Sequence, residues 1–373
     1  MIIIKLFSGI MMNHQNNKIY YNNEFNFKLI IFIYLILMHL IFNQISQKNG
    51  KKKRIGVVGL SHSQNIGNNL LKYSMFIILE KYGFEPYIIG RHPGKCNISF
   101  LKNYVNVRVI KNFSEIKETD YDILLVNSDQ TWRKWNKDFY NVAFLKFSEN
   151  WNIPKFIYGT SIAIKQWRFT KKDEKIAKKL LKNFTGISVR ETNLAELIKK
   201  HLGLKSVLVL DPTLLIDKNY YLKVVKDYKN NINNINYIFT YKIKHPEIKK
   251  KMEEFTIEAS KKLHYDIYNV RMKDNEYIER FLYGINNSKA VITDSFHGTV
   301  FSIIFNKPFI SFKRKNDERL KTLKNLLGLK HRIIESDENP DISLLNKPLY
   351  INKVKLNKIK IISLKYLKKN LNI

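Results

Sequence analysis

Residues 290–312 read AVITDSFHGTVFSIIFNKPFISF, and this stretch indicates the fold of the chain. Its first residues, Ala290 to Thr293, form a short apolar run typical of a buried strand. A polar turn follows, then a helix expected from Thr299 to Phe305 and a strand expected from Pro308 to Phe312. Strands that alternate with helices in this way predict a parallel sheet covered by helices.

The same alternation extends over most of the chain. Upstream of Ala290 we expect strands at residues 237–243 and 266–270, a helix at 277–286, and a helix whose apolar residues 248, 252, 255, 259 and 263 share one face. An earlier run begins at Arg54, with strands expected at residues 55–60, 86–89, 123–126, 156–158, 187–189 and 207–210. Its first helix should bury the face that carries Leu71, Met75, Ile78 and Tyr82. Two such runs predict an α/β protein with two Rossmann-like domains.

The boundary between the runs is expected in residues 217–236, which are rich in Asn and Lys. We therefore predict an N-terminal Rossmann-like domain over 51–216, a linker over 217–236, and a C-terminal Rossmann-like domain over 237–345. A basic tail should follow at 346–373. A chain of 373 residues, 45% hydrophobic and 26% charged, is long enough and apolar enough for two such domains.

The first fifty residues differ from the rest. They form an extension with an almost wholly apolar run at residues 29–42, shorter than the roughly 20 residues that span a bilayer as a helix. The basic cluster Lys51 to Arg54 would hold the downstream domain on the cytoplasmic side. Two interpretations stay open, a weak membrane anchor and an extension from a wrongly assigned start. The expected location is the cytoplasm or the cytoplasmic face of the membrane.

The charge is strongly basic, with 65 Lys and Arg against 32 Asp and Glu and a formal net charge of +33. Such a field attracts phosphorylated ligands, anionic lipids and nucleic acid alike. The lysines are scattered without a stripe of interleaved aromatics, so no specific nucleic-acid partner is expected. Residues 346–373 hold eight lysines and no acid. They predict either a solvated terminal element or a patch for an anionic membrane surface.

Metal and disulfide chemistry find little support in the sequence. Cys96 is the single cysteine, so the chain cannot form an internal disulfide, which favours a reducing compartment. No Cys/His group has zinc-ligand spacing, and no paired-Asp motif demands a metal. We therefore expect neither a metal nor a cofactor.

Polar loops after the predicted strands are the candidate sites, because ligands of open parallel sheets bind beyond the carboxyl ends of the strands. After the first strand, Gly67 would let the backbone approach a ligand at the start of a helix. The loop at 127–132 reads NSDQTW. Its carboxylate, amide and hydroxyl groups can form hydrogen bonds with the hydroxyls of a sugar, and Trp132 can stack on a sugar face. The alternative for Ser128 or Asp129 is a helix N-cap.

Arg190 and His297 are the strongest single candidates. Arg190 ends a predicted strand, and its guanidinium suits phosphate or carboxylate, although a salt bridge with Glu191 is the alternative. His297 begins a helix, where the helix dipole favours a neutral imidazole that can accept a proton. The two residues lie in different halves of the chain. If the sheets face each other, their polar loops meet across a cleft, as a two-substrate transferase requires.

Six motifs in order carry a resemblance to a known family. They are Asn65-Ile-Gly-Asn68, Asn127-Ser-Asp-Gln-Thr-Trp132, Tyr158-Gly-Thr-Ser161, Ser188-Val-Arg-Glu191, Asp211-Pro-Thr-Leu-Leu215 and Thr293-Asp-Ser-Phe-His-Gly-Thr-Val-Phe-Ser302. The sequence resembles the polysaccharide pyruvyl transferase family from about Arg54 to Arg332. This resemblance implies a fold similar to B-type glycosyltransferases and phosphoenolpyruvate as donor. It implies as acceptor a sugar of a surface polysaccharide or of its lipid-linked precursor.

The resemblance also implies roles for residues. Arg190 and His297 match the donor-binding and catalytic positions of the family. The sequence departs from the family at Asn127, where Gly is usual, at Asp294, where Asn is frequent, and at Ser295, where some branches have Arg. Lys313, Arg314 and Arg319 are candidates for the missing cation.

Arg190 and His297 are the expected catalytic residues. Donor binding is expected from Arg190, Ser295, Gly298, Thr299 and Arg319. Acceptor binding is expected from Asn65, Asn68, Ser128, Asp129, Gln130, Trp132 and Ser161. Two other functions stay open, a glycosyltransferase of the same architecture that uses a nucleotide sugar, and a non-enzymatic binding module that uses the basic surface.

Overall fold

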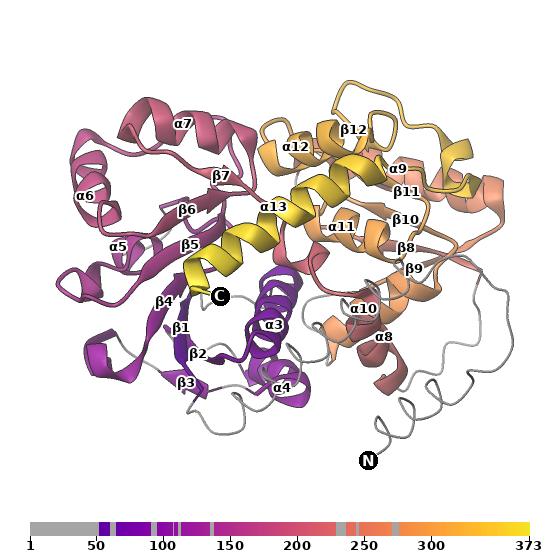
Figure 1. The fold of residues 1–373 in the computed structure, drawn as a ribbon. Helices are drawn as coiled ribbons and strands as arrows, with labels where there is room; N and C mark the ends of the chain where they lie inside the picture. Colours follow the sequence, from indigo (N-terminus) through magenta and orange to yellow (C-terminus); the bar gives the residue numbers. More distant parts are fainter. Residues whose placement is uncertain are drawn as a thin grey trace, which may run out of the picture. The chain divides into compact units, whose positions relative to one another are not determined.

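The computed structural model describes residues 52–59, 65–90, 95–106, 108–110, 113–134, 138–228, 236–243, 246–270 and 276–373 (Figure 1). The apolar run at 29–42 lies outside the described residues, as do residues 61–64 of the first polar loop. Within the described ranges, no helix combines the length and the apolar character needed to cross a bilayer.

The first sheet contains seven described strands, all parallel, in the order β3-β2-β1-β4-β5-β6-β7. These strands are β1 (Arg54–Val58), β2 (Glu85–Ile89), β3 (Arg108–Ile110), β4 (Ile123–Val126), β5 (Lys155–Thr160), β6 (Gly186–Val189) and β7 (Val207–Leu208). The helices of this half are α3 (Ile66–Lys81), α4 (Lys95–Tyr104), α5 (Phe139–Phe144), α6 (Lys171–Leu181) and α7 (Thr192–Leu202).

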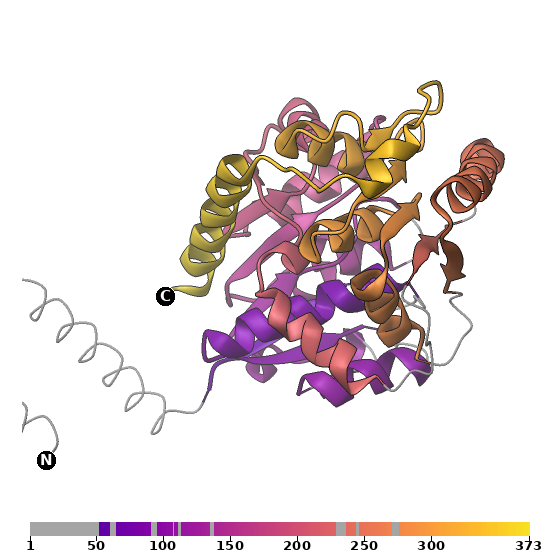
Figure 2. The ribbon, with the colours of Figure 1, turned by 90° about the vertical axis from the view of Figure 1, so that its right-hand side faces the viewer.

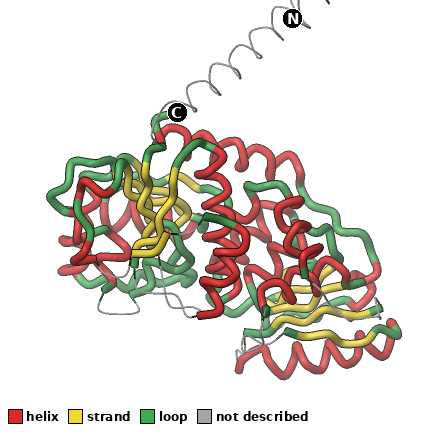
Figure 3. The backbone as a smooth tube through the Cα atoms, turned by 90° about the horizontal axis from the view of Figure 1, so that it is seen from below, coloured by secondary structure: helices red, strands yellow, loops and turns green. Residues whose placement is uncertain are grey.

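The second sheet contains five described strands, also parallel, in the order β12-β11-β10-β8-β9. These strands are β8 (Tyr237–Tyr241), β9 (Asp266–Asn269), β10 (Ala290–Thr293), β11 (Phe309–Phe312) and β12 (Ile333–Ile334). The helices of this half are α8 (Lys218–Asp227), α9 (Pro246–Leu263), α10 (Tyr277–Asn287), α11 (Phe296–Ile304), α12 (Glu318–Leu327) and α13 (Lys353–Leu371). Figure 3 shows the two groups of strands with helices between them.

The predicted fold class, α/β with two Rossmann-like parallel sheets, is confirmed. The strands that the sequence did not predict, β3 and β12, have three and two residues, which is too short for a pattern of hydrophobicity to show. Helix α11 begins at Phe296, earlier than expected, because Ser295 caps it by accepting a hydrogen bond from the Gly298 N–H at 3.3 Å. His297 therefore lies in the first turn of the helix.

Helix α3 is buried more completely than predicted. The sequence suggested one apolar face, but every residue from Ile66 to Leu79 is buried. The helix packs against β2 and α4 on the first sheet, and also against α10 and the short 3-10 turn Pro212–Leu214. The Ser74 and Tyr221 hydroxyls lie 2.7 Å apart within this contact. Because α3 is shared by both halves, its first turn has a defined position beside α11.

Two segments outside the predicted domains are helical. The predicted linker contains α8, whose Tyr221 and Val224 are buried. The predicted tail is mostly α13, which runs from beside the second sheet back to the first (Figure 1). There the Tyr366 hydroxyl donates to the Ile157 carbonyl at 2.8 Å, and the Leu210 N–H donates to Ser363 Oγ at 2.9 Å. The inner face of α13 therefore belongs to the core.

Candidate active site

The candidate residues come from the carboxyl ends of strands in both sheets, as the rule for parallel sheets predicts. Asp129 lies three residues after β4, and Arg190 directly follows β6. His297 follows β10 at the start of α11. Arg319 lies in the first turn of α12, beyond β11. The structure brings these four side chains into one buried cluster.

Arg190 is held by two carboxylates. One terminal nitrogen of its guanidinium donates to Asp129, and the other donates to Asp211. The remaining oxygen of Asp129 accepts a hydrogen bond from Arg319 Nη1 at 2.6 Å. Arg319 also donates to Asp317 Oδ2 at 2.7 Å. A continuous chain of charge-assisted hydrogen bonds therefore connects the loops of the first sheet with those of the second.

The charges in this cluster stabilise one another. Burial alone would raise the pKa of Asp129, but Arg319 and Arg190 outweigh it and hold the pKa below its usual value. The pKa of Asp211 is likewise low, because Arg190 and His297 outweigh the effect of burial. The pKa of Arg319 is raised above its usual value, since Asp129 and Asp317 outweigh its desolvation. The pKa of Asp317 is also held low, because Arg319 and Arg314 outweigh its burial, and that of Arg190 is raised by Asp129 and Asp211. Both arginines and these three aspartates are therefore charged.

The ring of Phe296 lies near both guanidinium groups. Its centroid is 5.6 Å from Arg190 Cζ and 5.1 Å from Arg319 Cζ, within the range of cation–π contacts. The ring is nearly buried, so the contact is largely shielded from water. Phe296 thus contacts both of the guanidinium groups that Asp129 bridges.

His297 is packed into the same cluster with 4% of its surface exposed. Its Nε2 lies 3.6 Å from Asp211 Oδ2, within ion-pair range but longer than a hydrogen bond. Its Nδ1 faces Gly67 of α3, where an added Cβ would lie only 2.0 Å from the ring nitrogen. The sequence suggested that Gly67 lets backbone approach a ligand. In the structure it lets backbone approach His297.

Three residues expected to bind the donor form the turn that carries His297. Ser295 caps α11, and the Thr299 hydroxyl donates to the Ser295 carbonyl at 3.0 Å and to Ser311 Oγ at 2.7 Å. Gly298 packs so closely on Thr293 that a Cβ would lie 2.4 Å from its Oγ1. These contacts explain the small residues at this turn without a ligand.

Among the candidates for the cation missing at Ser295, Arg319 reaches the cluster directly. Arg314 instead donates to Asp317 Oδ2 at 2.6 Å, so it is connected to Arg319 through Asp317. Lys313 pairs with Glu335 at 2.8 Å. Arg319 therefore stands beside Arg190 as the second guanidinium on Asp129.

The residues expected to bind the acceptor have different surroundings. Asn65 caps α3, where its Oδ1 accepts from the Asn68 N–H at 3.3 Å. Gln130 Oε1 accepts from Arg133 at 3.0 Å. Ser128 Oγ is buried and has no hydrogen-bond partner among the described residues, and the same holds for Asn127 Oδ1. Both oxygens therefore lack a partner among the described residues, and Asn127 was not among the residues expected to bind the acceptor.

Two expectations for the acceptor need correction. Trp132 has no exposed surface and packs edge-on against Phe144 at 5.3 Å, because the segment after β4 turns back into the core of the first half. Its ring therefore has no free face for a sugar. Both oxygens of Asp129 are occupied by guanidinium groups, so Asp129 belongs to the arginine cluster instead of reading sugar hydroxyls.

Glu191 does not form the salt bridge with Arg190 that was considered as an alternative. Its Oε1 accepts hydrogen bonds from Ser161 Oγ at 2.7 Å and from the Ala163 N–H at 2.6 Å. Burial raises the pKa of Glu191 to about 7 despite the nearby Arg190. Ser161, expected at the acceptor, is thus tied to a buried carboxyl group of the adjacent loop.

Sequence reasoning assigned no role to Asp211 and did not single out Asp317. Asp211 follows β7 and caps the 3-10 turn at Pro212, where Thr213 donates to it through its N–H and its hydroxyl at 3.0 and 2.7 Å. The position of Asp211 after a predicted strand could have marked it as a candidate site residue. Asp317 caps α12 and resembles an ordinary helix cap in the sequence.

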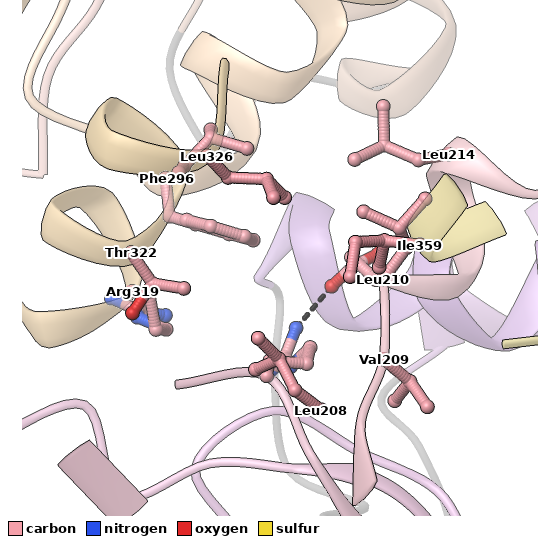
Figure 4. Close-up of a pocket in the computed structure, with 12 residues that line it drawn as sticks. Leu208, Val209, Leu210, Leu214, Phe296, Arg319, Thr322, Leu326 and Ile359 are labelled. Carbon is pink, nitrogen blue, oxygen red and sulfur yellow. Dashed lines mark hydrogen bonds and ion pairs between the residues drawn. The ribbon is translucent and has the colours of Figure 1, made fainter. Parts of the chain in front are cut away.

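A pocket of about 350 Å³, including the part open to solvent, borders the cluster (Figure 4). Arg190, Asp211 and Arg319 supply its polar wall. Apolar side chains supply most of the remainder, among them Leu210, Leu326 and Ile359 of α13. Within the described part of the chain, no group of His, Cys, Asp or Glu is arranged to hold a metal ion.

Comparisons with solved structures find chains of similar fold. The S. aureus MnaA–UDP structure matches with a TM-score of 0.51 at 15% identity, over 86% of this chain and 97% of that one. UDP-GlcNAc 2-epimerase from Neisseria meningitidis, solved with UDP-GlcNAc, matches with a TM-score of 0.50 at 10% identity, over 86% and 94%. At such identities the likeness concerns the fold alone. A search of curated proteins finds no significant match.

The sequence itself matches a family profile. The profile described as polysaccharide pyruvyl transferase covers residues 65–316, well over half of the chain. This range includes Arg190, Asp211 and His297 and ends just before Arg319. The match agrees with the ordered motifs and with their convergence in one buried cluster. The chain belongs to the polysaccharide pyruvyl transferase family.

Proposed function

We propose that the protein transfers the pyruvyl group of phosphoenolpyruvate to two hydroxyls of one sugar in a surface polysaccharide or its lipid-linked precursor. The observation that supports this most is the buried His297 beside two guanidinium groups, Arg190 and Arg319, in a member of this family. A histidine can move protons, and paired guanidiniums can hold a donor with both a phosphate and a carboxylate.

The reaction requires two carbon–oxygen bonds to form at one carbon. The first hydroxyl oxygen adds to the enol carbon while the methylene takes up a proton and becomes a methyl group. The second hydroxyl oxygen then displaces phosphate from the same carbon and loses its proton. The products are a cyclic ketal and inorganic phosphate, with no change in oxidation state.

His297 is the proposed proton-transfer residue. Its imidazole is within 3.6 Å of the ionised Asp211, which would stabilise the imidazolium that forms when a hydroxyl loses its proton. Asp211 does not face the solvent and keeps its charge through Arg190 and Thr213. General acid–base catalysis of this kind contributes roughly 10²–10⁴-fold.

Arg190 and Arg319 are the proposed donor-binding residues, helped by the positive end of the α11 helix dipole. Both guanidiniums contact Asp129. An incoming phosphate or carboxylate would compete with this carboxylate, because a further buried anion needs a cation of its own. We therefore propose that the donor displaces Asp129 from at least one arginine.

The acceptor is proposed to bind near Asn127 and Ser128. Their Oδ1 and Oγ atoms are buried without partners in the described structure, and burying an unpaired polar atom is costly. Sugar hydroxyls would satisfy both atoms. Asn65 and Asn68 at the start of α3 remain part of the proposal.

The test is phosphate release from phosphoenolpyruvate in the presence of a panel of lipid-linked and free glycans, with mass spectrometry of the glycan. We expect release that depends on one glycan class and yields a pyruvylated product. Phosphate release without any gain of mass on a glycan would contradict the proposal.

A nucleotide-sugar glycosyltransferase is the second candidate, since the fold resembles a structure solved with UDP. That function predicts thermal stabilisation by a nucleoside diphosphate and none by phosphoenolpyruvate. A thermal-shift comparison of the two ligands separates the candidates, because a ligand that binds the native state raises the melting temperature.

A further inference from the structure

The last 24 residues contain the four most exposed large hydrophobic side chains of the described chain. Tyr350 and Val354 are each 80% exposed, Ile373 is 55% exposed and Ile361 is 54% exposed. The next, Ile257 on α9, is 51% exposed. Scattered apolar residues on a surface are normal, but a concentration in one segment indicates an interaction surface.

The same segment is strongly basic. Residues 346–373 hold eight lysines and no acid, so no carboxylate within the segment neutralises them. Val354, Lys358, Ile361, Lys365 and Lys368 follow one another at spacings of 4, 3, 4 and 3, which places them on one face of α13. All five are exposed, and Lys368 Nζ lies 5.9 Å from the centroid of the Tyr82 ring. The outer face of α13 thus alternates aliphatic and cationic side chains.

The opposite face of α13 is already occupied by the core. Ser363, Tyr366 and Leu367 are buried, and the first two are hydrogen-bonded to the first half of the chain. Figure 2 shows α13 at the outside of the described fold, with both sheets on one side of it. The exposed lysines and aliphatic chains are therefore not needed to hold the helix in place.

We propose that the outer face of α13 docks the protein onto an anionic membrane surface. Anionic headgroups complement the lysines, and the adjacent acyl region accepts aliphatic side chains and the ring of Tyr350. A second copy of the chain would bring the same lysines and be repelled. A nucleic acid would match the charge but offers no apolar surface for Val354 and Ile361.

Docking at this face would bring the membrane close to the candidate site. Ile359, on the inner side of α13, lines the pocket whose polar wall is Arg190 and Arg319. One helix therefore separates the proposed membrane surface from the arginine cluster. The docking proposal does not depend on the proposed reaction, since it rests on the charge and exposure of α13 alone.

The experiment measures sedimentation of the full chain with phosphatidylcholine vesicles that do or do not contain phosphatidylglycerol. The test variant carries Lys355→Glu, Lys358→Glu and Lys365→Glu, three exposed lysines of α13. The matched control carries Lys172→Glu, Lys175→Glu and Lys178→Glu, three exposed lysines of α6, so that the net charge changes equally. Both variants keep the first fifty residues.

We expect wild type and the α6 control to bind phosphatidylglycerol vesicles with similar affinity. The α13 variant should bind on the order of 100-fold more weakly, since each basic residue near an anionic surface contributes roughly fivefold. Val354→Ser with Ile361→Ser should weaken binding by roughly tenfold at unchanged charge. Added salt should reduce wild-type binding, because it screens the lysines.

Two results would overturn the proposal. Equal loss of vesicle binding in the α13 and α6 variants would show that net charge, and not this face, attracts the membrane. Loss of single-stranded DNA binding in the α13 variant without loss of vesicle binding would assign the surface to nucleic acid. Circular dichroism of each variant establishes that the fold is retained in both comparisons.

Discussion

The arginine cluster and the outer face of α13 show two opposite uses of positive charge in one chain. In the cluster, Arg190 and Arg319 are almost wholly buried, and their guanidinium groups are paired with aspartates. On α13, Lys358 and Lys365 are exposed without a carboxylate in the segment. The buried pairs hold the arginine side chains in defined positions, although burying their charges costs desolvation free energy. The exposed lysines attract anions over a longer range, and salt screens this attraction.

The difference teaches how the effect of a charge depends on its surroundings. In the cluster the removal of one partner leaves another charge buried and uncompensated, so single substitutions should have large effects. On α13 each lysine acts nearly alone, so effects should be small and additive. The following substitutions test this contrast.

The largest effect is expected for His297→Ala. We expect turnover to fall by about 10²-fold or more with a retained fold, because the change removes proton transfer. Steady-state kinetics with phosphoenolpyruvate varied would measure it. The control is His201→Ala, which removes an imidazole that stacks on Trp167 away from the cluster and should leave turnover unchanged. Wild-type turnover in His297→Ala would place the active site elsewhere.

Glu191→Gln tests the burial of a carboxyl group that forms no salt bridge. Burial raises the pKa of Glu191 from 4.5 to about 7, so the native state keeps a proton that the unfolded state loses. The stability from this group is fully present below about pH 4.5 and is lost as the pH rises to about 7.

Glutamine has no such titration. As the pH rises from 4.5 to 7, the unfolding free energy of wild type should therefore fall by about 3 kcal/mol relative to that of Glu191→Gln. Denaturant unfolding across this range would measure it. A difference between variant and wild type that does not change with pH would contradict the buried, neutral carboxyl group.

Arg190→Lys tests the guanidinium group that bridges Asp129 and Asp211. A lysine keeps the charge but cannot contact Asp129 and Asp211 with parallel donors, so the KM for phosphoenolpyruvate should rise by roughly tenfold or more. The matched control is Arg332→Lys, because Arg332 is also buried but donates to backbone carbonyls such as Leu344 O at 3.0 Å. The control should lower stability and leave the KM unchanged. An unaltered KM in Arg190→Lys would remove Arg190 from the donor site.

Gly67→Ala tests the approach of α3 to His297. The added Cβ would lie 2.0 Å from Nδ1, so the imidazole must leave its present position beside Asp211, and turnover should fall by roughly tenfold. The control is Gly203→Ala, where φ is +70° and nothing lies within 4 Å. It should lose about 1 kcal/mol of stability through backbone strain and keep full turnover. Equal turnover in the two variants would contradict the contact.

The smallest effect is expected for Lys358→Gln. This side chain is exposed on α13, so the unfolding free energy should change by less than about 0.5 kcal/mol. Denaturant unfolding at low and high salt would measure it. A larger change would show that the lysines of α13 stabilise the fold, and the contrast with the buried cluster would fail.

The fold was predictable because its signals are local. The apolar runs at residues 123–126 and 290–293 coincide with β4 and β10. A parallel strand that is buried on both faces is a continuous apolar run, so it can be recognised from the sequence of the strand alone. The strand-end rule also selected Arg190 and His297, which the structure places in one buried cluster. It failed for Trp132, because an aromatic residue after a strand can turn outward to a ligand or inward to the core.

The sequence by itself determined the α/β class, the two runs of strands and the candidates Arg190 and His297. Only the tertiary structure decided what these residues contact. Arg319 and Asp129 stand 190 positions apart, and Gly67 and His297 come from different halves of the chain. A periodic pattern reports which face of an element is buried. It carries no information on which distant loop packs against that face, because that depends on how the two sheets and α3 fit together.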